Sequence, residues 1–595
     1  EKDKRYQAIA DQFTKNTVIV TYTGLADQTE ALVEKLKALK TEKTDDNVKS
    51  VCETFLNARA WWEKSEAFLF GAASDFGIDP HIDSWPLDLD GLLDEMKNTS
   101  HITAMEAEDA DVWAGVKLGP ELLGFHGIEY IIFEAGSPKA VSKIKDKELT
   151  YAIAVAGDLR NKCYQLQISW AGADNVDANR VTKVVDELEW NTTVASGENS
   201  YTQNMMLAGQ VGSTYTSWTG AMQAIIDGCK TIADEVGTSK IGKPHTGEDK
   251  NYIESPYSYN SITDFYDNII SIQNAYMGGI EGQRDESKSL HNYMASVNAD
   301  LDTKTIHAIT SALTKIKAMK APFVLNYTDD SCQEAMDACK ALDDVLTEVK
   351  AELVREWIVS LMDKGYTSTS INRKLSSLRS FYKFLLRKGE VCVNPLQKIT
   401  GPKNKKPLPT FLRESEMDKL LDEVDFGEGF KGCRDHMIIE MFYATGMRLS
   451  ELIGLDDKNV DFSSLLIKVT GKRNKQRLIP FGEELKNAMI EYVNVRNEIV
   501  LTRTGAFFVR ESGERLSRSI VENLVKRNLS KVVTLKKRSP HVLRHTFATT
   551  MLNHDAELGA IKELLGHESL ATTEVYTHTT FEELKKVYNQ AHPRA

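Results

Sequence analysis

The most informative stretch of this chain reads Ser539-Pro540-His541-Val542-Leu543-Arg544-His545, followed by Leu564-Leu565-Gly566-His567 and by Thr573-Glu574-Val575-Tyr576. On a helix, His541 and Arg544 share one face because they are three positions apart. Gly566 predicts the end of a second helix, so that His567 lies in the following turn and Tyr576 a short helical run later. One permanent cation, two imidazoles and a phenol suit an anionic oxygen centre that a tyrosine oxygen attacks.

Two motifs that precede this stretch complete the set. Thr445-Gly446-Met447-Arg448-Leu449-Ser450-Glu451-Leu452 supplies a second arginine, and Lys472 lies in a polar turn between two predicted strands within 465–481. Together these motifs resemble the tyrosine recombinase family, specifically its Xer-type members. The resemblance implies a mainly α-helical catalytic domain with a small β-hairpin, and it implies the catalytic set Arg448, Lys472, His541, Arg544, His567 and Tyr576.

The chemistry of such a set follows from the charge of a DNA phosphodiester. Attack by Tyr576 would build a second negative charge on the phosphate oxygens, and the guanidinium forks of Arg448 and Arg544 can hold these oxygens bidentately. Lys472 could protonate the leaving 5′ oxygen, while the two histidines orient the phosphate and handle the tyrosine proton. The expected product is a covalent 3′-phosphotyrosine, which conserves the bond energy for rejoining and requires no cofactor.

The charge of the chain is divided unevenly. The 595 residues carry a formal net charge of −13, and a hydrophobic content of 42% is ordinary for a globular protein. Residues 353–595 hold 40 Lys and Arg against 30 Asp and Glu, so the totals of 73 and 86 leave 33 against 56 for residues 1–352. The C-terminal part therefore suits a polyanion, whereas the N-terminal part repels one. No apolar run is long enough for a membrane helix, and no Cys-x-x-Cys indicates a zinc or redox motif.

Residues 1–352 are predicted to be almost wholly helical. The repeat of Ile262, Phe265 and Ile269 at spacings of three and four indicates the seam of a helical bundle. One helix is expected between Pro120 and Gly136, and it places His126 and Glu129 in its apolar stripe. A charged pair at such a position must be bonded to other polar groups or must hold a ligand.

The sequence around this pair is Gly124-Phe125-His126-Gly127-Ile128-Glu129, which matches the Gly-x-His-x-x-Glu motif of imelysin-like proteins. Trp85-Pro86-Leu87-Asp88 and residues 254–265 are also similar to that family. The resemblance implies an exported, all-helical domain with two bundle-like halves, often linked to iron and assigned as a peptidase. His126 and Glu129 could hold a divalent metal or iron, could bind a peptide or other ligand, or could form a structural pair. A metal site needs three or four ligands, and the sequence identifies only these two, so all three possibilities stay open.

These patterns predict four segments: an imelysin-like all-helical domain over 1–352, a truncated SAM-like core-binding segment over 353–393, a Pro/Lys-rich linker over 394–409, and the recombinase catalytic domain over 410–595. The core-binding segment contains a predicted helix with an apolar face and a basic face, and the basic face is expected to contact DNA phosphates. The predicted DNA-binding residues are Arg373, Lys374, Arg379, Lys383, Lys403, Lys405, Lys406, Arg473 and Lys475.

The imelysin-like pattern runs into recombinase-like sequence without a flexible joint, and only about half of a core-binding domain follows, which suggests that two unrelated proteins were joined. We expect double-stranded DNA as partner, bound by a tetramer of recombinase protomers on two sites. The recombinase part implies the cytoplasm, whereas the N-terminal part resembles periplasmic or outer-membrane-anchored proteins. Two alternatives stay open: an exported metal- or ligand-binding protein with a passenger recombinase sequence, and a type IB topoisomerase with the same nucleophile.

Overall fold

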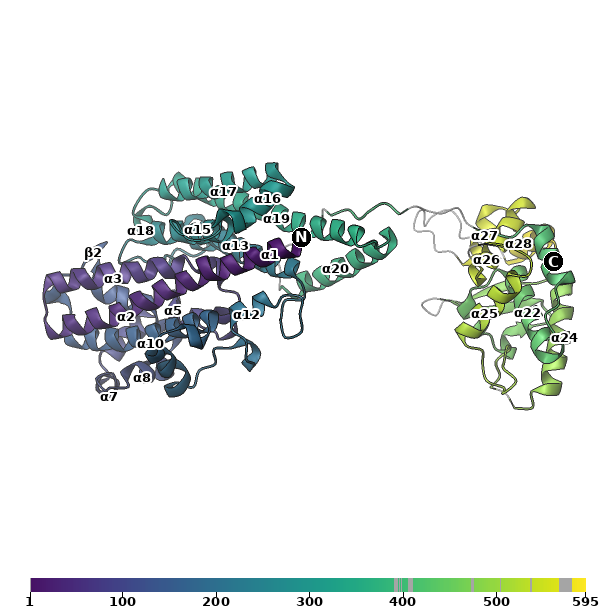
Figure 1. Ribbon diagram of the computed structural model, residues 1–595, viewed down its shortest axis with the longest axis horizontal. Coiled ribbons are helices and arrows are strands. Elements are labelled where there is room, and N and C mark those ends of the chain that lie inside the picture. The colour runs from purple at the N-terminus through teal and green to yellow at the C-terminus, as the bar shows by residue number, and fades with distance from the viewer. Residues whose placement is uncertain are drawn as a thin grey trace. The chain divides into compact units, whose positions relative to one another are not determined.

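The computed structural model describes residues 2–389, 394, 396–397, 399–404, 410–471, 476–502, 504–535, 538–566 and 581–594. The chain forms two compact units, Glu1–Asn404 and Lys405–Ala595 (Figure 1). Among the described residues, strands form only a two-stranded hairpin and a three-stranded antiparallel sheet, and nearly all other regular structure is helical. The expected multidomain, mainly α-helical fold is confirmed.

The first unit is built from helices and one short β-hairpin. Its elements are α1 (Lys2–Phe13), α2 (Val20–Thr41), α3 (Asp45–Glu63), α4 (Ala72–Asp75), α5 (Asp79–Ile82), α6 (Leu89–Glu95), α7 (Thr99–Ala104), α8 (Ala110–Lys117), α9 (Phe125–Ile132), β1 (Phe133–Glu134), β2 (Ser137–Pro138), α10 (Asp146–Ala171), α11 (Ala178–Val181), α12 (Tyr201–Met206), α13 (Trp218–Glu235), α14 (Gly242–Thr246), α15 (Ser261–Met277), α16 (Leu290–Val297), α17 (Ala299–Lys317), α18 (Phe323–Asn326), α19 (Asp330–Asp363) and α20 (Ser368–Lys388). Helix α2 packs against α3 and α10, while α19 packs against α13 and α17. These two groups of long helices make up the bundle (Figure 1).

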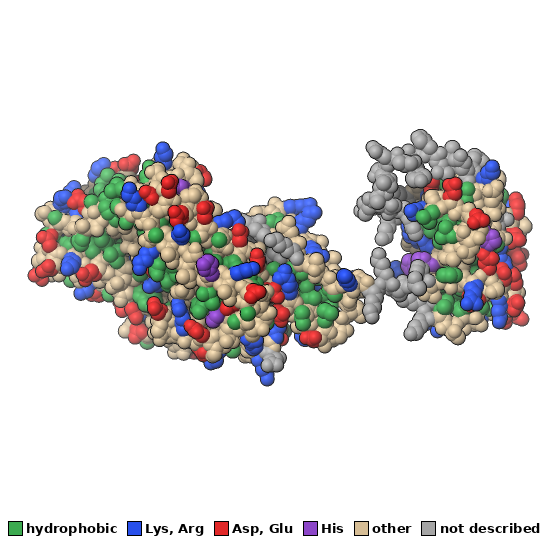
Figure 2. All heavy atoms as spheres, turned by 90° about the horizontal axis from the view of Figure 1, so that it is seen from above, with side chains coloured by type: hydrophobic (Ala, Val, Ile, Leu, Met, Phe, Trp, Pro, Cys, Tyr) green, Lys and Arg blue, Asp and Glu red, His purple; other side chains and the backbone are tan. Residues whose placement is uncertain are grey.

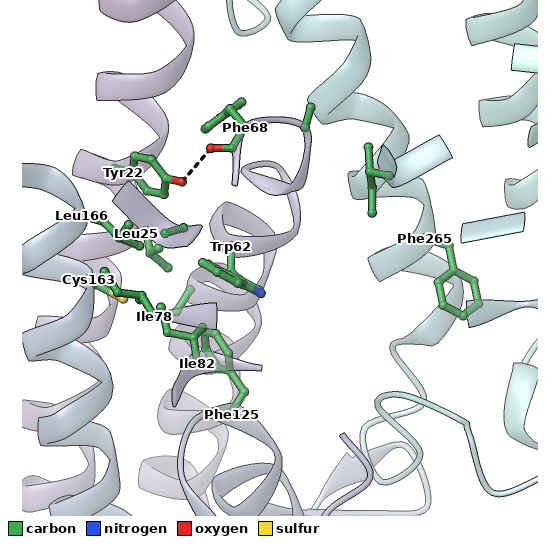
Figure 3. Close-up of a cluster of buried hydrophobic side chains, with 14 of the residues drawn as sticks. Tyr22, Leu25, Trp62, Phe68, Ile78, Ile82, Phe125, Cys163, Leu166 and Phe265 are labelled. Atoms are coloured by element: carbon green, nitrogen blue, oxygen red, sulfur yellow. Dashed lines mark hydrogen bonds between the residues drawn. The ribbon is translucent and has the colours of Figure 1, made fainter. Parts of the chain in front are cut away.

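The core of this unit lies where α2, α3, α9 and α10 meet. Trp62 and Phe125 are completely buried there, together with Leu25 and Leu166 (Figure 3). Aromatic side chains of this size bury large apolar areas, so they account for much of the stability of the bundle.

The segment with the Gly-x-His-x-x-Glu motif is shorter than the sequence predicts. The single helix expected between Pro120 and Gly136 is divided into a 3-10 turn at Pro120–Leu122 and α9, and the chain is already extended at Phe133. Gly124 interrupts it with a φ of +81°, a conformation that favours glycine. A Cβ at this position would lie 2.1 Å from the carbonyl oxygen of Ile82, so the turn before α9 touches the backbone at the end of α5.

Helix α19 runs through the expected domain boundary at 352/353 without a break. Leu353 belongs to the core of the bundle, whereas Val354 already belongs to a small second core that Leu375 of α20 and Ile399 complete. Residues 353–404 therefore form one compact unit with the bundle. The boundaries of the expected domains stay predictions, and seven of the 16 residues of the expected linker, at 395, 398 and 405–409, lie outside the described residues.

The second unit packs helices around a three-stranded sheet. Its elements are α21 (Glu414–Asp418), α22 (Gly429–Thr445), α23 (Leu449–Ile453), β3 (Val460–Asp461), β4 (Leu466–Thr470), β5 (Gln476–Pro480), α24 (Glu483–Ile499), α25 (Arg518–Leu529), α26 (Pro540–Asn553), α27 (Leu558–Leu565) and α28 (Phe581–Ala591). The strand order is β3-β4-β5, and Thr470 pairs with Gln476 at the end of the hairpin that the sequence predicts. Tyr588 of α28 is fully buried in a small core with Phe547 and Leu564.

The surface of the first unit mixes charges of both signs. On the face shown in Figure 2, acidic and basic side chains are interspersed over the described residues of the first unit. None of the helices that the structure describes is both long enough and apolar enough to cross a bilayer.

Candidate functional site

The first predicted catalytic residue, Arg448, is placed by the turn between α22 and α23. Gly446 ends α22 with a φ of +58°, and Arg448 is the residue that precedes the first turn of α23. Its backbone N–H donates to Oε2 of Glu451 at 2.7 Å, which caps the helix. Its guanidinium donates to Oε1 of Glu451 at 3.0 Å and to the carbonyl oxygen of Gly566 at 2.7 Å.

Helix α26 brings Arg544 to the same turn. Its guanidinium donates to the carbonyl oxygens of Gly446 and Leu565, both at 2.5 Å. Arg544 is 7% exposed, and burial together with the neighbouring cations Arg448 and Arg477 lowers its pKa to about 10. The guanidinium therefore stays charged at neutral pH. The two arginines that the sequence predicts are thus brought together between the Gly446 turn and the end of α27.

A third arginine, which the sequence motifs did not single out, completes this cluster. Both terminal nitrogens of Arg477 donate to the carboxylate of Glu451, one of them to Oε2 at 2.8 Å, and its Nε donates to the carbonyl oxygen of Leu564 at 2.9 Å. Burial raises the pKa of Glu451, but hydrogen bonds from Arg477 and the Arg448 backbone outweigh it, so the pKa lies below its ordinary value. Three cations around one anion leave a net positive charge, which suits a phosphate.

His541 lies in the first turn of α26 and is exposed, one helical turn before Arg544. The neighbouring His545 has a pKa below its ordinary value because of burial and of repulsion by His541 and Arg544. The other three members of the predicted set, Lys472, His567 and Tyr576, lie outside the described residues. The catalytic set as a whole therefore stays a prediction.

The predicted DNA-binding residues are distributed over both units. Arg373, Lys374 and Lys383 are exposed on α20, and Lys403 is exposed beyond it. Arg379 is half-buried and donates to the carbonyl oxygen of Ile399, so part of its guanidinium holds the chain after α20. The remaining predicted contacts lie outside the described residues: Lys405, Lys406, Arg473 and Lys475.

In the first unit, His126 and Glu129 are each 1% exposed, as the apolar stripe predicts. His126 Nδ1 lies 3.4 Å from Oε2 of Glu129, and its Nε2 lies 2.8 Å from Oδ1 of Asp83. Oε1 of Glu129 faces a different segment, where it accepts hydrogen bonds from the backbone N–H groups of Tyr257 and Ser258 and from the Ser258 hydroxyl. Oε1 of Glu129 is therefore fully occupied as a hydrogen-bond acceptor within the protein.

The histidine belongs to a larger buried charge network. Arg59 is 1% exposed and contacts three carboxylates: Asp83, Glu63 at 2.6 Å and Asp264 at 3.5 Å. Lys240, 2% exposed, lies 3.2 Å from Glu254. Sequence reasoning missed both cations, although Glu254 and Asp264 lie inside the imelysin-like segment 254–265. Nothing in the sequence indicated which distant lysine or arginine would neutralise them.

The network contains donors of the kinds that hold divalent cations. Asp83, His126 and Glu254 have ligand atoms within 4.8 Å of one another, and Glu63, Glu66 and Asp83 form a second such group. Neither group includes Glu129. Burial lowers the pKa of His126, but hydrogen bonds with Asp83 and Glu129 outweigh it and raise the pKa to about 9. The raised pKa favours the protonated imidazole, which has no free lone pair for a metal ion, and in this conformation Arg59 and Lys240 supply positive charge beside the carboxylates.

Comparison with known proteins identifies relatives for both the N-terminal and the C-terminal part of the chain. The chain matches the family described as Imelysin over residues 18–349, the Phage integrase family over residues 410–583, and the phage integrase N-terminal SAM-like domain over residues 333–389. The SAM-like match thus begins inside the imelysin match, within α19.

Individual relatives show the same two parts. Tyrosine recombinase XerC of Chlorobaculum tepidum is 38% identical over 317 residues, which cover 50% of this chain and 91% of the relative. Tyrosine recombinase XerC of Chlorobaculum parvum is 40% identical over 284 residues, which cover 44% of this chain and 84% of the relative. The crystal structure of a putative iron-regulated protein A precursor from Parabacteroides distasonis has a TM-score of 0.51 and 26% identity, and it covers 59% of this chain and 96% of its own.

The fold and the arginine cluster define a DNA breaking-and-rejoining domain that is joined to an all-helical bundle. The chain belongs to the tyrosine recombinase family through its C-terminal part and to the imelysin family through its N-terminal part. Both resemblances noted in the sequence, and the expected recombinase class of enzyme, are confirmed.

Proposed function

We propose that the C-terminal part cleaves and rejoins DNA at specific sites through a covalent bond between Tyr576 and a 3′ phosphate. The observation that carries this proposal is the convergence of Arg448 and Arg544 on the neighbouring backbone carbonyls of Gly566 and Leu565, although 96 positions separate the two arginines in the sequence. Their guanidinium groups lie at the two ends of a short segment, Leu565–Gly566, that leads directly to His567.

In the proposed reaction, the Tyr576 oxygen attacks phosphorus and the bond to the 5′ oxygen breaks. Arg448 and Arg544 stabilise the charge that grows on the two non-bridging oxygens, and they can do so only if the phosphate displaces some of their present backbone contacts. Lys472 gives its proton to the leaving 5′ oxygen, and one of the two histidines accepts the single proton that the tyrosine releases. Attack of a 5′ hydroxyl on the phosphotyrosine reverses these steps. Because nucleophile, acid and base are side chains, the reaction requires no cofactor.

The proposed partner is double-stranded DNA, bound by four protomers on two sites, as the family membership supports. The exposed basic face of α20 would contact the sugar-phosphate backbone and contribute affinity more than sequence preference. Because the activity needs access to cellular DNA, we propose the cytoplasm as its compartment.

The test is covalent attachment to an oligonucleotide duplex that carries a nick beside the cleavage point, so that the cleaved end diffuses away and the intermediate accumulates. The full chain should yield a protein–DNA adduct that survives denaturing electrophoresis, and Tyr576→Phe should yield none. Tyr492→Phe is the matched control, because it removes a hydroxyl that donates to the Phe507 carbonyl elsewhere in the domain. An adduct that persists in Tyr576→Phe would remove this residue from the proposed role.

We propose, second, that the N-terminal part takes up a divalent cation such as iron or zinc at Asp83, His126 and Glu254. The ligand atoms of these three residues, two of which are buried, lie within 4.8 Å of one another and support this proposal. Binding must expel the proton of His126, so uptake of zinc should increase from pH 7 to pH 9.5. Metal analysis after dialysis compares the full chain with His126→Gln. Equal zinc content in both proteins at pH 9.5 would leave only the structural role of the network.

A further inference from the structure

Arg477 lies on β5, outside the six residues of the predicted catalytic set, yet it makes the densest set of contacts in the arginine cluster. Its side chain is 15% exposed, and its Nε and both terminal nitrogens are engaged by Glu451 and the carbonyl oxygen of Leu564. A planar fork held bidentately by a carboxylate has little freedom to turn toward a substrate. Arg477 is therefore poorly placed to bind a phosphate itself.

The contacts of Arg477 join the three segments that lead to the predicted catalytic residues. Glu451 also holds the guanidinium and the backbone N–H of Arg448. The Leu564 carbonyl lies at the end of α27, three positions before His567 in the sequence. Strand β5 begins four positions after Lys472. Arg477 thus connects α23, the β-hairpin and the end of α27 through one side chain.

The packing at Gly566 is consistent with a close fit. Gly566 has a φ of +62°, and a Cβ there would lie 3.1 Å from Cδ of Arg477. Its carbonyl oxygen accepts from Arg448 at 2.7 Å. The turn that precedes His567 therefore rests against the stem of Arg477 on one side and is hydrogen-bonded to Arg448 on the other.

We propose that Arg477 is a positioning residue of the recombination site. It holds Glu451 against Arg448 and connects the β-hairpin to the end of α27. The segments that carry Lys472 and His567 therefore begin at fixed positions. This inference rests on the proposed function, because it assigns Arg477 to the same cleavage reaction. Its contribution is geometric, since a displacement of reacting groups by about 1 Å is enough to cost about 100-fold in rate.

The experiment measures the single-turnover rate of adduct formation on the nicked duplex, and separately the affinity for the same duplex. Arg477→Gln should form the adduct about 100-fold more slowly with unchanged DNA affinity. Arg477→Lys, which keeps the charge but not the planar fork, should fall between Arg477→Gln and the unchanged protein. Glu451→Gln weakens the same ion pair through its other partner. It should also slow adduct formation while the DNA affinity stays unchanged.

Arg434→Gln is the matched control. Arg434 is also buried, holds a carboxylate, Asp435, with two nitrogens at 3.1 and 2.8 Å, and donates to a backbone carbonyl, that of Val509. It makes none of the contacts of the arginine cluster, so its substitution should cost similar thermal stability and leave the rate of adduct formation unchanged.

The outcomes separate this inference from the proposed function. If the unchanged protein forms the adduct, Tyr576→Phe does not, and Arg477→Gln is as fast as Arg434→Gln, the proposed function stands and the positioning role is overturned. A parallel fall of rate and DNA affinity in Arg477→Gln would also overturn it, because Arg477 would then be a DNA contact. Failure of the unchanged protein to form any adduct would overturn both.

Discussion

The pKa of His126 predicts how the stability of the first unit depends on pH. Hydrogen bonds with Asp83 and Glu129 raise it from an ordinary 6.5 to about 9. Because the folded protein binds this proton more tightly than the unfolded chain, the stabilisation is complete below pH 6.5 and is lost as the pH rises through 9. At about 1.4 kcal/mol per pKa unit, the free energy of unfolding should decrease by about 3 kcal/mol across this window.

The upper part of this window lies above the pKa values of two neighbouring acids. Burial, which outweighs the attraction of Arg59 in both cases, raises the pKa of Glu63 to about 7 and that of Asp264 to about 6. Because their pKa values are higher in the folded protein than in the unfolded chain, the free energy of unfolding decreases as the pH rises to about 6 for Asp264 and about 7 for Glu63. Above pH 7.5 these two acids contribute little further change. Burial also raises the pKa values of Glu66 and Glu254, so the share of the slope that belongs to His126 is the difference between the unchanged protein and a variant without this imidazole.

Tryptophan fluorescence isolates the first unit in urea unfolding of the full chain. All eight tryptophans lie between Trp61 and Trp357, so none belongs to residues 405–595. His126→Gln should flatten the pH dependence between pH 7.5 and 9.5. His245→Gln is the control, because His245 hydrogen-bonds the carbonyl of Tyr327. An unfolding free energy that falls equally steeply in His126→Gln and the unchanged protein would refute this account of the charge network.

Three further predictions concern single contacts. Arg59→Met leaves three buried carboxylates without their common cation, so the same fluorescence assay at pH 7 should show a loss of about 3–5 kcal/mol. Lys97→Met, at an exposed ion pair with Asp94, should leave the unfolding transition unchanged. Gly446→Ala places a Cβ 2.5 Å from Phe547 at a φ of +58°. Unfolding followed by circular dichroism should show that the second unit loses about 1–3 kcal/mol of its free energy of unfolding. An unchanged transition would contradict the packing of this turn. Replacing Arg373 and Lys374 with glutamine should reduce the slope of log affinity for DNA against log salt by about 0.9 for each phosphate that these side chains neutralise, and an unchanged slope would remove α20 from the DNA interface.

Local structure could be predicted from the sequence, whereas contacts between residues that are distant in the sequence could not. The β-hairpin at 466–480 follows from alternating residues around a polar turn, and the burial of His126 and Glu129 follows from their place in an apolar stripe. The turn at Gly124 was missed because a single glycine inside an apolar run predicts neither its φ nor its contact with Ile82. Tertiary structure alone decides such contacts.

The charge networks illustrate the same limit. Arg477 was visible in the sequence only as one of several basic residues near a turn, and its ion pair with Glu451, 26 positions earlier, depends on how the sheet packs against α23. The pairing of Lys240 with Glu254 is equally hidden, since a buried lysine has no distinctive sequence context. A buried charge reveals its partner only when the fold is known.

The continuity of α19 bears on how the bundle and the core-binding helix act together. Lys350, near the middle of this helix, donates to both carboxylate oxygens of Asp227 on α13, and its ammonium lies 5.6 Å from the ring of Tyr382 on α20. A flexible linker would let α20 meet DNA independently of the acidic bundle. A shared helix instead fixes the side from which DNA can approach, because Arg373 and Lys383 are exposed, away from the core that α20 forms with α19. In the proposed interface, electrostatic repulsion by the net negative charge of the bundle would oppose the approach of DNA to α20.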